Sequence, residues 1–161
     1  MSKRKKFFSE LFSIKSLGRV CFFYLTTSAI TRHIGEIIIC KGSSMEPTIS
    51  SGDIVIGERL TLKYGKLRTN DIVALIAPND SKSLLCKRIT HKEFEKVENC
   101  PFVYKNILPK GFFFVQGDNR AVSSDSRHFG PVPEGLIDVK LALRIWPLNK
   151  IGWLSDRWFW E

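Results

Sequence analysis

The chain has 161 residues, of which 43% are hydrophobic and 25% are charged. This length suits one domain with its own core, and the composition excludes a wholly disordered, collagen-like or polytopic membrane protein. The four cysteines form no CxxC pair and no His/Cys cluster, which excludes a disulfide scaffold and a zinc ribbon. We therefore expect no metal and no cofactor. The cysteine pattern does not exclude a single disulfide bridge.

The net charge of +9 is unevenly distributed. Residues 1–19 hold six basic residues against one acidic residue, whereas residues 20–161 carry a net charge of only +4. A basic protein can bind nucleic acid or an anionic membrane. Because the excess charge is confined to the N-terminus, we expect a membrane partner and no nucleic acid.

Residues 20–31 form an uncharged stretch close to this basic N-terminus. As a helix, twelve residues rise only about 18 Å against a hydrocarbon core of roughly 30 Å, so a transmembrane helix would need residues 17–34 with an arginine near each end. A peripheral helix and a cleaved targeting peptide have the same layout. We predict a retained membrane-anchoring helix within residues 1–33, followed by one domain over residues 34–161.

Short apolar runs separated by turn-forming residues follow this N-terminal segment. Six such runs with little helix between them predict a compact, mostly antiparallel β-fold. Their apolar character is consistent with a partly closed sheet or barrel. The expected strands lie at residues 37–40, 53–57, 71–76, 84–89, 112–116 and 139–145.

A serine-containing turn follows the first expected strand. In the sequence Gly-Ser-Ser-Met-Glu-Pro, Ser44 lies where Gly42 and Pro47 force the backbone to turn. Such a turn can expose a nucleophile, although a lone serine in a turn is usually structural. The interpretation therefore depends on whether a base is available.

Lys87 is the candidate base. A serine hydroxyl needs a neighbouring base, and of the three histidines only His128 adjoins another suggestive segment. A lysine can do this work if burial lowers its pKa, because the neutral amine then accepts the proton. Lys87 ends the apolar run Leu-Leu-Cys, so a strand would direct its side chain toward the interior, although a lysine taken alone usually faces solvent.

The segment 117–127 combines turn formers, two aspartates, two arginines and three serines between apolar strands. Such side chains can satisfy one another by hydrogen bonds, and Asp–Arg pairs can make the loop rigid. A phosphate-binding loop would instead need a glycine-rich cradle followed by a helix. The composition therefore indicates a rigid loop that is not a nucleotide site.

Taken in order, the motifs SMEPT, KRI and GDNRAVSSDSRHFGPV resemble those of type I signal peptidases, which are membrane-anchored serine proteases with a Ser-Lys dyad. The resemblance covers about residues 40–147, and the forms CKGSSMEPTI, CKRI and RIWPL are most similar to the mitochondrial inner membrane branch of the family. It implies an endopeptidase that removes sorting or signal peptides from precursor proteins delivered to the intermembrane space. It also implies a catalytic domain facing that space and a heterodimer with a second, related subunit.

The resemblance assigns a role to eight residues. It implies that Ser44 is the nucleophile, that Lys87 is its general base, and that Ser123 occupies the position of a serine that hydrogen-bonds the lysine amine. The supporting residues are Asp125 and Arg127, which match a structural ion pair, and Gly117, Asp118 and Asn119, which match the loop that supports the lysine.

The sequence departs from the family pattern at several places. Residues 91–95 replace a Gly-x-Pro-Gly-Asp segment, and Asn70 stands where glycine often precedes Asp71. Gly42 stands where some relatives have an oxyanion-hole hydroxyl, so the Ser44 backbone N–H is expected to carry more of that role. Only 29 residues separate Lys87 from Gly117, which leaves no room for the second β-domain of larger relatives. We therefore expect a minimal catalytic unit.

Two other functions stay open at the level of sequence. A soluble, self-cleaving repressor would use the same Ser-Lys chemistry, although no DNA-binding domain precedes the serine turn in this sequence. A non-enzymatic basic β-barrel that binds nucleic acid would need aromatic and basic residues interleaved on its strands, whereas the four tryptophans lie near the C-terminus.

Two cysteines lie close in sequence to the candidate dyad. Cys40 precedes Ser44 by four residues, and Cys86 directly precedes Lys87. Free cysteines are often buried as small hydrophobic residues. We expect this role for both cysteines, with no requirement for either in catalysis.

Overall fold

The computed structural model describes residues 14–33, 35–98 and 100–155, and the chain divides into two compact units, residues 1–34 and 35–161. The described part of the first unit is helix α2, Ile14–His33. The helix expected in this region is therefore present. Its apolar side chains stay largely exposed, with exposed fractions of 65% for Phe22 and 70% for Phe23.

No helix in the described part of the chain is both long enough and apolar enough to cross a membrane. The expectation of a transmembrane helix is therefore not supported. The uncharged stretch of α2 has only twelve residues, and these include the hydroxyl side chains of Thr26, Thr27 and Ser28, which lower its apolar character.

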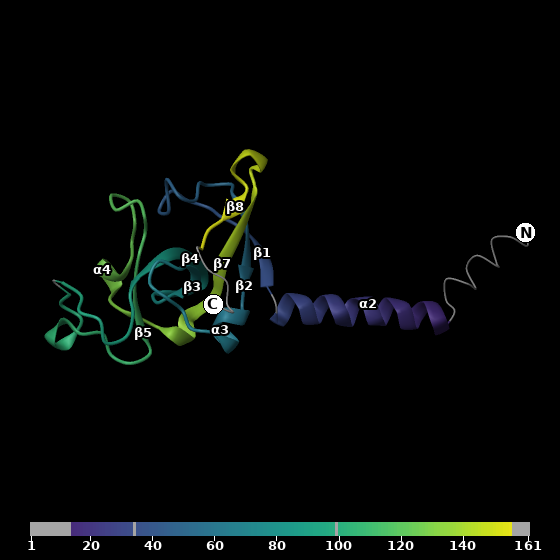
Figure 1. The fold of residues 1–161 in the computed structure, drawn as a ribbon, viewed down its shortest axis with the longest axis horizontal. Coiled ribbons are helices and arrows are strands. Elements are labelled where there is room, and N and C mark those ends of the chain that lie inside the picture. The colour runs from purple at the N-terminus through teal and green to yellow at the C-terminus, as the bar shows by residue number, and fades with distance from the viewer. Residues whose placement is uncertain (1–13, 34, 99, 156–161) are drawn as a thin grey trace, which may run out of the picture. The chain divides into compact units, whose positions relative to one another are not determined.

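The second unit is built on strands and a few short helices (Figure 1). The strands are β1 (Gly35–Ile39), β2 (Ile54–Glu58), β3 (Ile72–Ala77), β4 (Asp80–His91), β5 (Phe112–Gln116), β6 (Val132–Pro133), β7 (Ile137–Trp146) and β8 (Gly152–Trp153). The helices are α3 (Leu60–Tyr64), α4 (Ser126–Phe129) and the 3₁₀ turns Tyr104–Asn106, Glu134–Leu136 and Leu148–Lys150.

The strands form one antiparallel sheet in the order β1-β2-β7-β3-β4-β5-β6, and β8 pairs with β7. The predicted fold class, mostly antiparallel β, is confirmed. All six expected strands are present, and sequence reasoning missed only β6 and β8, which have two residues each. The described strands do not close into a barrel, because the path ends at β1 on one side and at β6 on the other.

Strand β3 is buried on both faces. Ile72 and Ala74 pack into a first cluster with β2, β7 and the segment after β1, whereas Val73 and Leu75 pack into a second cluster with β5 and β6. Successive side chains of a strand point to opposite faces, so one short strand joins the two clusters. The sheet therefore curls around two cores, and this curl brings β4 near the residues that follow β1.

The connection between β4 and β5 has a small core of its own. Val97, Cys100, Leu108 and Phe114 are buried together, and Lys96 bridges to Ile107. This compact connection occupies the place where the sequence leaves no room for a second β-domain.

Asp71 and Lys140 form a buried ion pair between the start of β3 and the middle of β7. Lys140 Nζ lies 3.0 Å from Asp71 Oδ1, and the two side chains are only 6% and 7% exposed. Asp71 also accepts hydrogen bonds from the Arg68 N–H at 2.9 Å and the Ser155 hydroxyl at 3.1 Å. Removing one member of such a pair leaves an uncompensated charge in the interior.

We expect Lys140→Met to lower the free energy of unfolding by about 3 kcal/mol, because Asp71 would remain buried without its cation. Urea unfolding of the full chain, followed by tryptophan fluorescence, measures the change. The control is Glu36→Gln, which breaks the half-exposed pair with Arg59 at 3.0 Å and should cost less than about 1 kcal/mol. Equal costs for both variants would contradict this reading of the buried pair.

Candidate active site

The turn that carries Ser44 is held in place by its apolar neighbours. Met45 and Ile49 are 3% and 2% exposed and pack in the first core cluster, and the Ile49 N–H donates to the Met45 carbonyl at 2.9 Å. Ser44, beside these buried side chains, is only half-buried. The core therefore holds the turn while the serine hydroxyl stays at its surface.

A buried carboxylate and an arginine fasten the far end of the same turn. Asp53 accepts hydrogen bonds from the Ser50 N–H at 3.0 Å and from Arg144 Nη1 at 3.2 Å. Arg144 Nη1 also donates to the Thr48 carbonyl at 2.7 Å. Because hydrogen bonds between charged groups are stronger than neutral ones, they limit the freedom of the turn.

Strand β4 brings Lys87 to this turn. Lys87 lies opposite Val73 of β3, is 2% exposed, and places Nζ 2.9 Å from Ser44 Oγ. Burial lowers the pKa of Lys87, because the charged ammonium loses its water, and Arg127 acts in the same direction while Asp125 and Cys86 oppose it. The structure thus joins a serine hydroxyl to a lysine amine that is biased toward its neutral form.

Arg88, the next residue of β4, ties the strand to the loop after β5. Its Nε and Nη2 atoms donate to the two carboxylate oxygens of Asp118 at 2.8 and 2.7 Å, and Nη1 donates to the Asn70 carbonyl at 3.0 Å. Burial raises the pKa of Asp118, but the hydrogen bonds from Arg88 outweigh this effect, and the pKa is lowered. The two parallel hydrogen bonds hold the part of β4 that carries Lys87 against the loop after β5.

The loop after β5 also touches the serine turn directly. The Asn119 N–H donates to the Ser44 carbonyl at 3.0 Å. A Cβ atom at Gly117 would lie 2.5 Å from that carbonyl oxygen and 2.2 Å from the Ser123 hydroxyl. Only glycine leaves room for the two backbones at this point.

Asp125 organises the rest of the loop. It is fully buried and accepts hydrogen bonds from Arg127 Nε at 2.8 Å, Arg127 Nη2 at 2.7 Å and the Gly117 N–H at 3.0 Å. Burial raises the pKa of Asp125, but the hydrogen bonds to its ionised form have the larger effect and lower the pKa to about 2. Its ionised form therefore stabilises the fold above its ordinary pKa of about 4, and this stabilisation is lost as the pH falls toward 2.

Ser123 departs from the expectation. Its buried hydroxyl makes no hydrogen bond of normal geometry with Lys87 or with another described residue. It lies close enough to Asp125 to help lower the pKa of that carboxyl. The Ser123 hydroxyl lies against the α-carbon of Gly117, where that residue has no side chain.

The structure gathers the eight residues singled out from the sequence around one serine turn. The loop Gly117–Asn119 forms hydrogen bonds with Ser44, Arg88 and Asp125. Sequence reasoning missed Arg88, Asp53 and Arg144. Arg88 and Arg144 lie within the motifs KRI and RIWPL, which was the available signal. His128 lies beside Asp125 in α4, with Nδ1 3.9 Å from its carboxylate.

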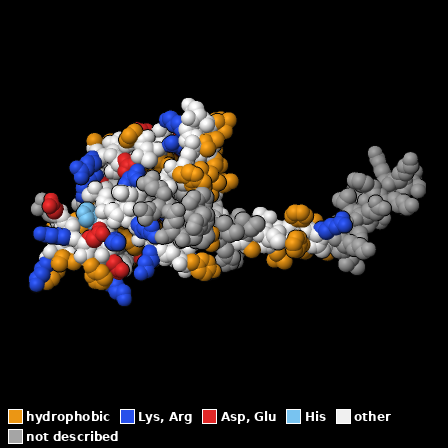
Figure 2. Space-filling model, viewed as in Figure 1, with side chains coloured by type: hydrophobic (Ala, Val, Ile, Leu, Met, Phe, Trp, Pro, Cys, Tyr) orange, Lys and Arg blue, Asp and Glu red, His pale blue; other side chains and the backbone are white. Residues whose placement is uncertain are grey.

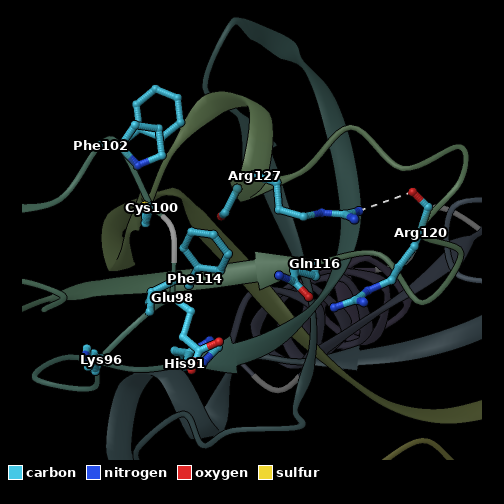
Figure 3. Close-up of a pocket in the computed structure, with 12 residues that line it drawn as sticks. His91, Lys96, Glu98, Cys100, Phe102, Phe114, Gln116, Arg120 and Arg127 are labelled. Atoms are coloured by element: carbon cyan, nitrogen blue, oxygen red, sulfur yellow. Dashed lines mark hydrogen bonds between the residues drawn. The ribbon is translucent and has the colours of Figure 1, made fainter. Parts of the chain in front are cut away.

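A hollow of about 540 Å³ lies next to this loop, between β5 and the β4–β5 connection (Figure 3). Phe102 and Phe114 line it together with Gln116, Arg120 and Arg127, and Arg127 donates to the Arg120 carbonyl at 3.4 Å. Ser44 and Lys87 do not line this hollow. In the described part of the chain, no three His, Cys, Asp or Glu side chains gather in a way that could hold a metal ion.

Comparison with known proteins places the chain in a family. The sequence profile of the family described as signal peptidase, peptidase S26, matches residues 14–91 and 90–146. The crystal structure of a signal peptidase I from Enterococcus faecalis V583 aligns with a TM-score of 0.37 and 21% identity, over 47% of this chain and 97% of that one.

Curated relatives carry a more specific name. The mitochondrial inner membrane protease subunit 1 of Mus musculus is 38% identical over 77% of each chain, and that of Homo sapiens is 38% identical over 76% of each chain. The mitochondrial inner membrane protease subunit 2 of Saccharomyces cerevisiae is 31% identical over 80% of this chain and 76% of its own. These matches, together with the family profile, show that the chain belongs to the signal peptidase family, peptidase S26, and is a signal peptidase-like protease.

Proposed function

We propose that this protein is a serine endopeptidase in which Ser44 is the nucleophile and Lys87 the general base. The observation that carries the proposal is the 2.9 Å contact between Ser44 Oγ and the buried Lys87 Nζ. A nucleophile within hydrogen-bond reach of a base that is biased toward its neutral form meets the requirement for covalent catalysis.

In the first step, Ser44 Oγ attacks the scissile carbonyl while Lys87 takes the hydroxyl proton. The resulting lysine ammonium then gives this proton to the leaving amine, and the acyl group remains on Ser44 as an ester. In the second step, the neutral amine activates a water molecule that hydrolyses the ester. The Ser44 backbone N–H is the donor we assign to the oxyanion, because Gly42 offers no hydroxyl.

The precursor is proposed to bind in an extended conformation beside the site. Strand β1 lies at the edge of the sheet and leads within five residues to Ser44. An edge strand offers unpaired backbone groups, which can hydrogen-bond an added peptide strand and leave side-chain pockets to select the residues before the cut.

The names of the relatives support a location and a partner. We propose that the chain acts at the mitochondrial inner membrane, that its catalytic unit faces the intermembrane space, and that it cleaves precursor proteins bearing sorting or signal peptides. Because relatives named subunit 1 and subunit 2 both match this chain, we also propose a heterodimer with a second, related subunit.

Exposed apolar side chains support contact with the membrane. In α2, Phe22, Phe23 and Leu25 are each at least 64% exposed, and a helix with so much apolar surface needs a cover other than water. In the second unit, hydrophobic side chains gather where β1 and β8 lie, and these include Ile37 and Trp153 at 69% and 55% exposure (Figure 2).

We expect Ser44→Ala to lower the rate of precursor cleavage by at least about 10⁴-fold, because no other group replaces the nucleophile. Ser43→Ala is the matched control, since Ser43 is an exposed neighbour in the same turn, and it should keep most of the activity. Cleavage of a presequence-bearing precursor by each purified full-length variant gives the comparison. An inactive Ser43 variant beside an active Ser44 variant would overturn the assignment.

Lys87→Arg is expected to be as inactive as Lys87→Ala, because a guanidinium stays protonated and cannot accept the serine proton. The wild-type kcat/KM should rise with pH as the Lys87 ammonium loses its proton. Its plateau should begin below the ordinary lysine range, since burial lowers the pKa of Lys87. His128→Ala should retain activity; loss of activity in that variant, with an active Lys87→Ala, would favour a histidine base.

The proposed location predicts the accessibility of the C-terminus. A C-terminal tag should be digested by protease added to mitochondria whose outer membrane has been ruptured, and should be protected in intact mitochondria. A matrix protein of known location serves as the control for inner-membrane integrity. A tag that stays protected after rupture would refute the orientation.

A further inference from the structure

Cys40 and Cys86 lie close in sequence to the two residues of the proposed dyad. Cys40 follows β1 and precedes Ser44 by four residues, and Cys86 is the residue before Lys87 in β4. Cys40 is 7% exposed in the first core cluster, and Cys86 is half-buried against the same cluster. The approach of the Ser44 turn to β4 thus brings together two pairs of side chains, one made of a serine and a lysine and the other of two cysteines.

Cys86 packs against the core cluster that contains Cys40, and this packing places the two thiols side by side. A side-chain hydrogen bond joins Cys40 and Cys86, and this bond is the main cause that lowers the pKa of Cys40 and raises that of Cys86. Both cysteines are free thiols in the structure. The other two cysteines lie elsewhere, Cys21 exposed in α2 and Cys100 in the small core of the β4–β5 connection.

We propose that Cys40 and Cys86 form a reversible disulfide whose formation displaces Lys87 from Ser44 and switches off the protease. The contact of the two thiols and their places in the chain beside the dyad carry this inference. The effect on activity rests on the proposed function, whereas disulfide formation does not.

The oxidant is a small-molecule disulfide such as glutathione disulfide. A thiolate of the pair attacks one of its sulfur atoms, which forms a mixed disulfide and expels one thiolate as leaving group. The second protein thiolate then attacks the protein sulfur of the mixed disulfide and expels the other leaving thiolate. In sum, two protein thiols are oxidised, one disulfide is reduced to two thiols, and a reductant reverses both steps.

The short length of a disulfide bond predicts that linking Cys40 to Cys86 lowers the activity. Two thiols in hydrogen-bond contact must draw together by roughly 1.5 Å to reach a disulfide bond of about 2.05 Å. Cys40 resists this movement, because its N–H donates to the Asp53 carbonyl at 2.8 Å and its carbonyl accepts from the Gly52 N–H at 2.9 Å. Cys86 is also held, because it pairs with Ala74 in the β3–β4 ladder. Closing the bond therefore shifts the serine turn and β4 relative to each other and moves Lys87 away from Ser44, and a misplacement of about 1 Å can cost about 100-fold in rate.

The test uses the full-length protein with Cys21→Ser and Cys100→Ala, so that the pair provides its only thiols. Incubation with glutathione disulfide should lower the mass by 2 Da, and proteolysis without reductant should release a peptide linked through Cys40 and Cys86. Precursor cleavage should fall at least tenfold in proportion to the linked fraction and should recover when dithiothreitol is added.

Cys40→Ala and Cys86→Ala, each made in the same background, are the matched controls. Each should cleave the precursor when reduced and should keep most of this activity after the same treatment. Absence of the linked peptide would overturn the proposal, as would a linked protein with unchanged activity or equal inhibition of both alanine variants. An inactive reduced protein that still forms the link would instead count against the proposed protease.

Discussion

A lysine amine that is held out of water beside a serine hydroxyl is the interaction on which the rest of this structure depends. The Lys87 side chain is 2% exposed, although a lysine normally keeps its charge in solvent. The surroundings lower the cost of this burial by favouring the neutral amine, which is the form that the proposed reaction uses. The same desolvation that makes the residue costly to bury therefore makes it a usable base.

Keeping such an amine neutral requires that nearby carboxylates already have partners. Asp125 lies in the neighbourhood of Lys87 and raises its pKa, but it is paired with Arg127 and with a backbone N–H. Asp118 is likewise bound to Arg88 by two hydrogen bonds. Each carboxylate thus has its own cation, so Lys87 is not needed as a counter-ion.

The same pairs also position the backbone. Arg88 joins β4 to the loop after β5, and Asn119 of that loop holds the carbonyl of Ser44. Asp53 and Arg144 hold the other end of the serine turn. The turn is therefore fixed from two sides by elements far apart in the sequence, which suits a site that must hold a short contact between two side chains.

The sequence by itself determined the strands, the serine turn and the family. Six strands could be predicted because apolar runs are local patterns in the sequence. The grouping of Ser44 with Lys87 could be predicted because motifs such as SMEPT and KRI are recognised from the sequence alone. Twelve uncharged residues predict a helix but do not decide whether that helix crosses a bilayer.

Only the tertiary structure decided which polar groups meet. The short distance between Ser44 and Lys87, the role of Arg144 behind the serine turn and the surroundings of the Ser123 hydroxyl all depend on how the sheet curls. The contact between Cys40 and Cys86 has the same origin. Such contacts join residues up to 96 positions apart, as in the bond from Arg144 to Thr48, and no local pattern records them because the distance between such side chains is set by the packing of the two cores.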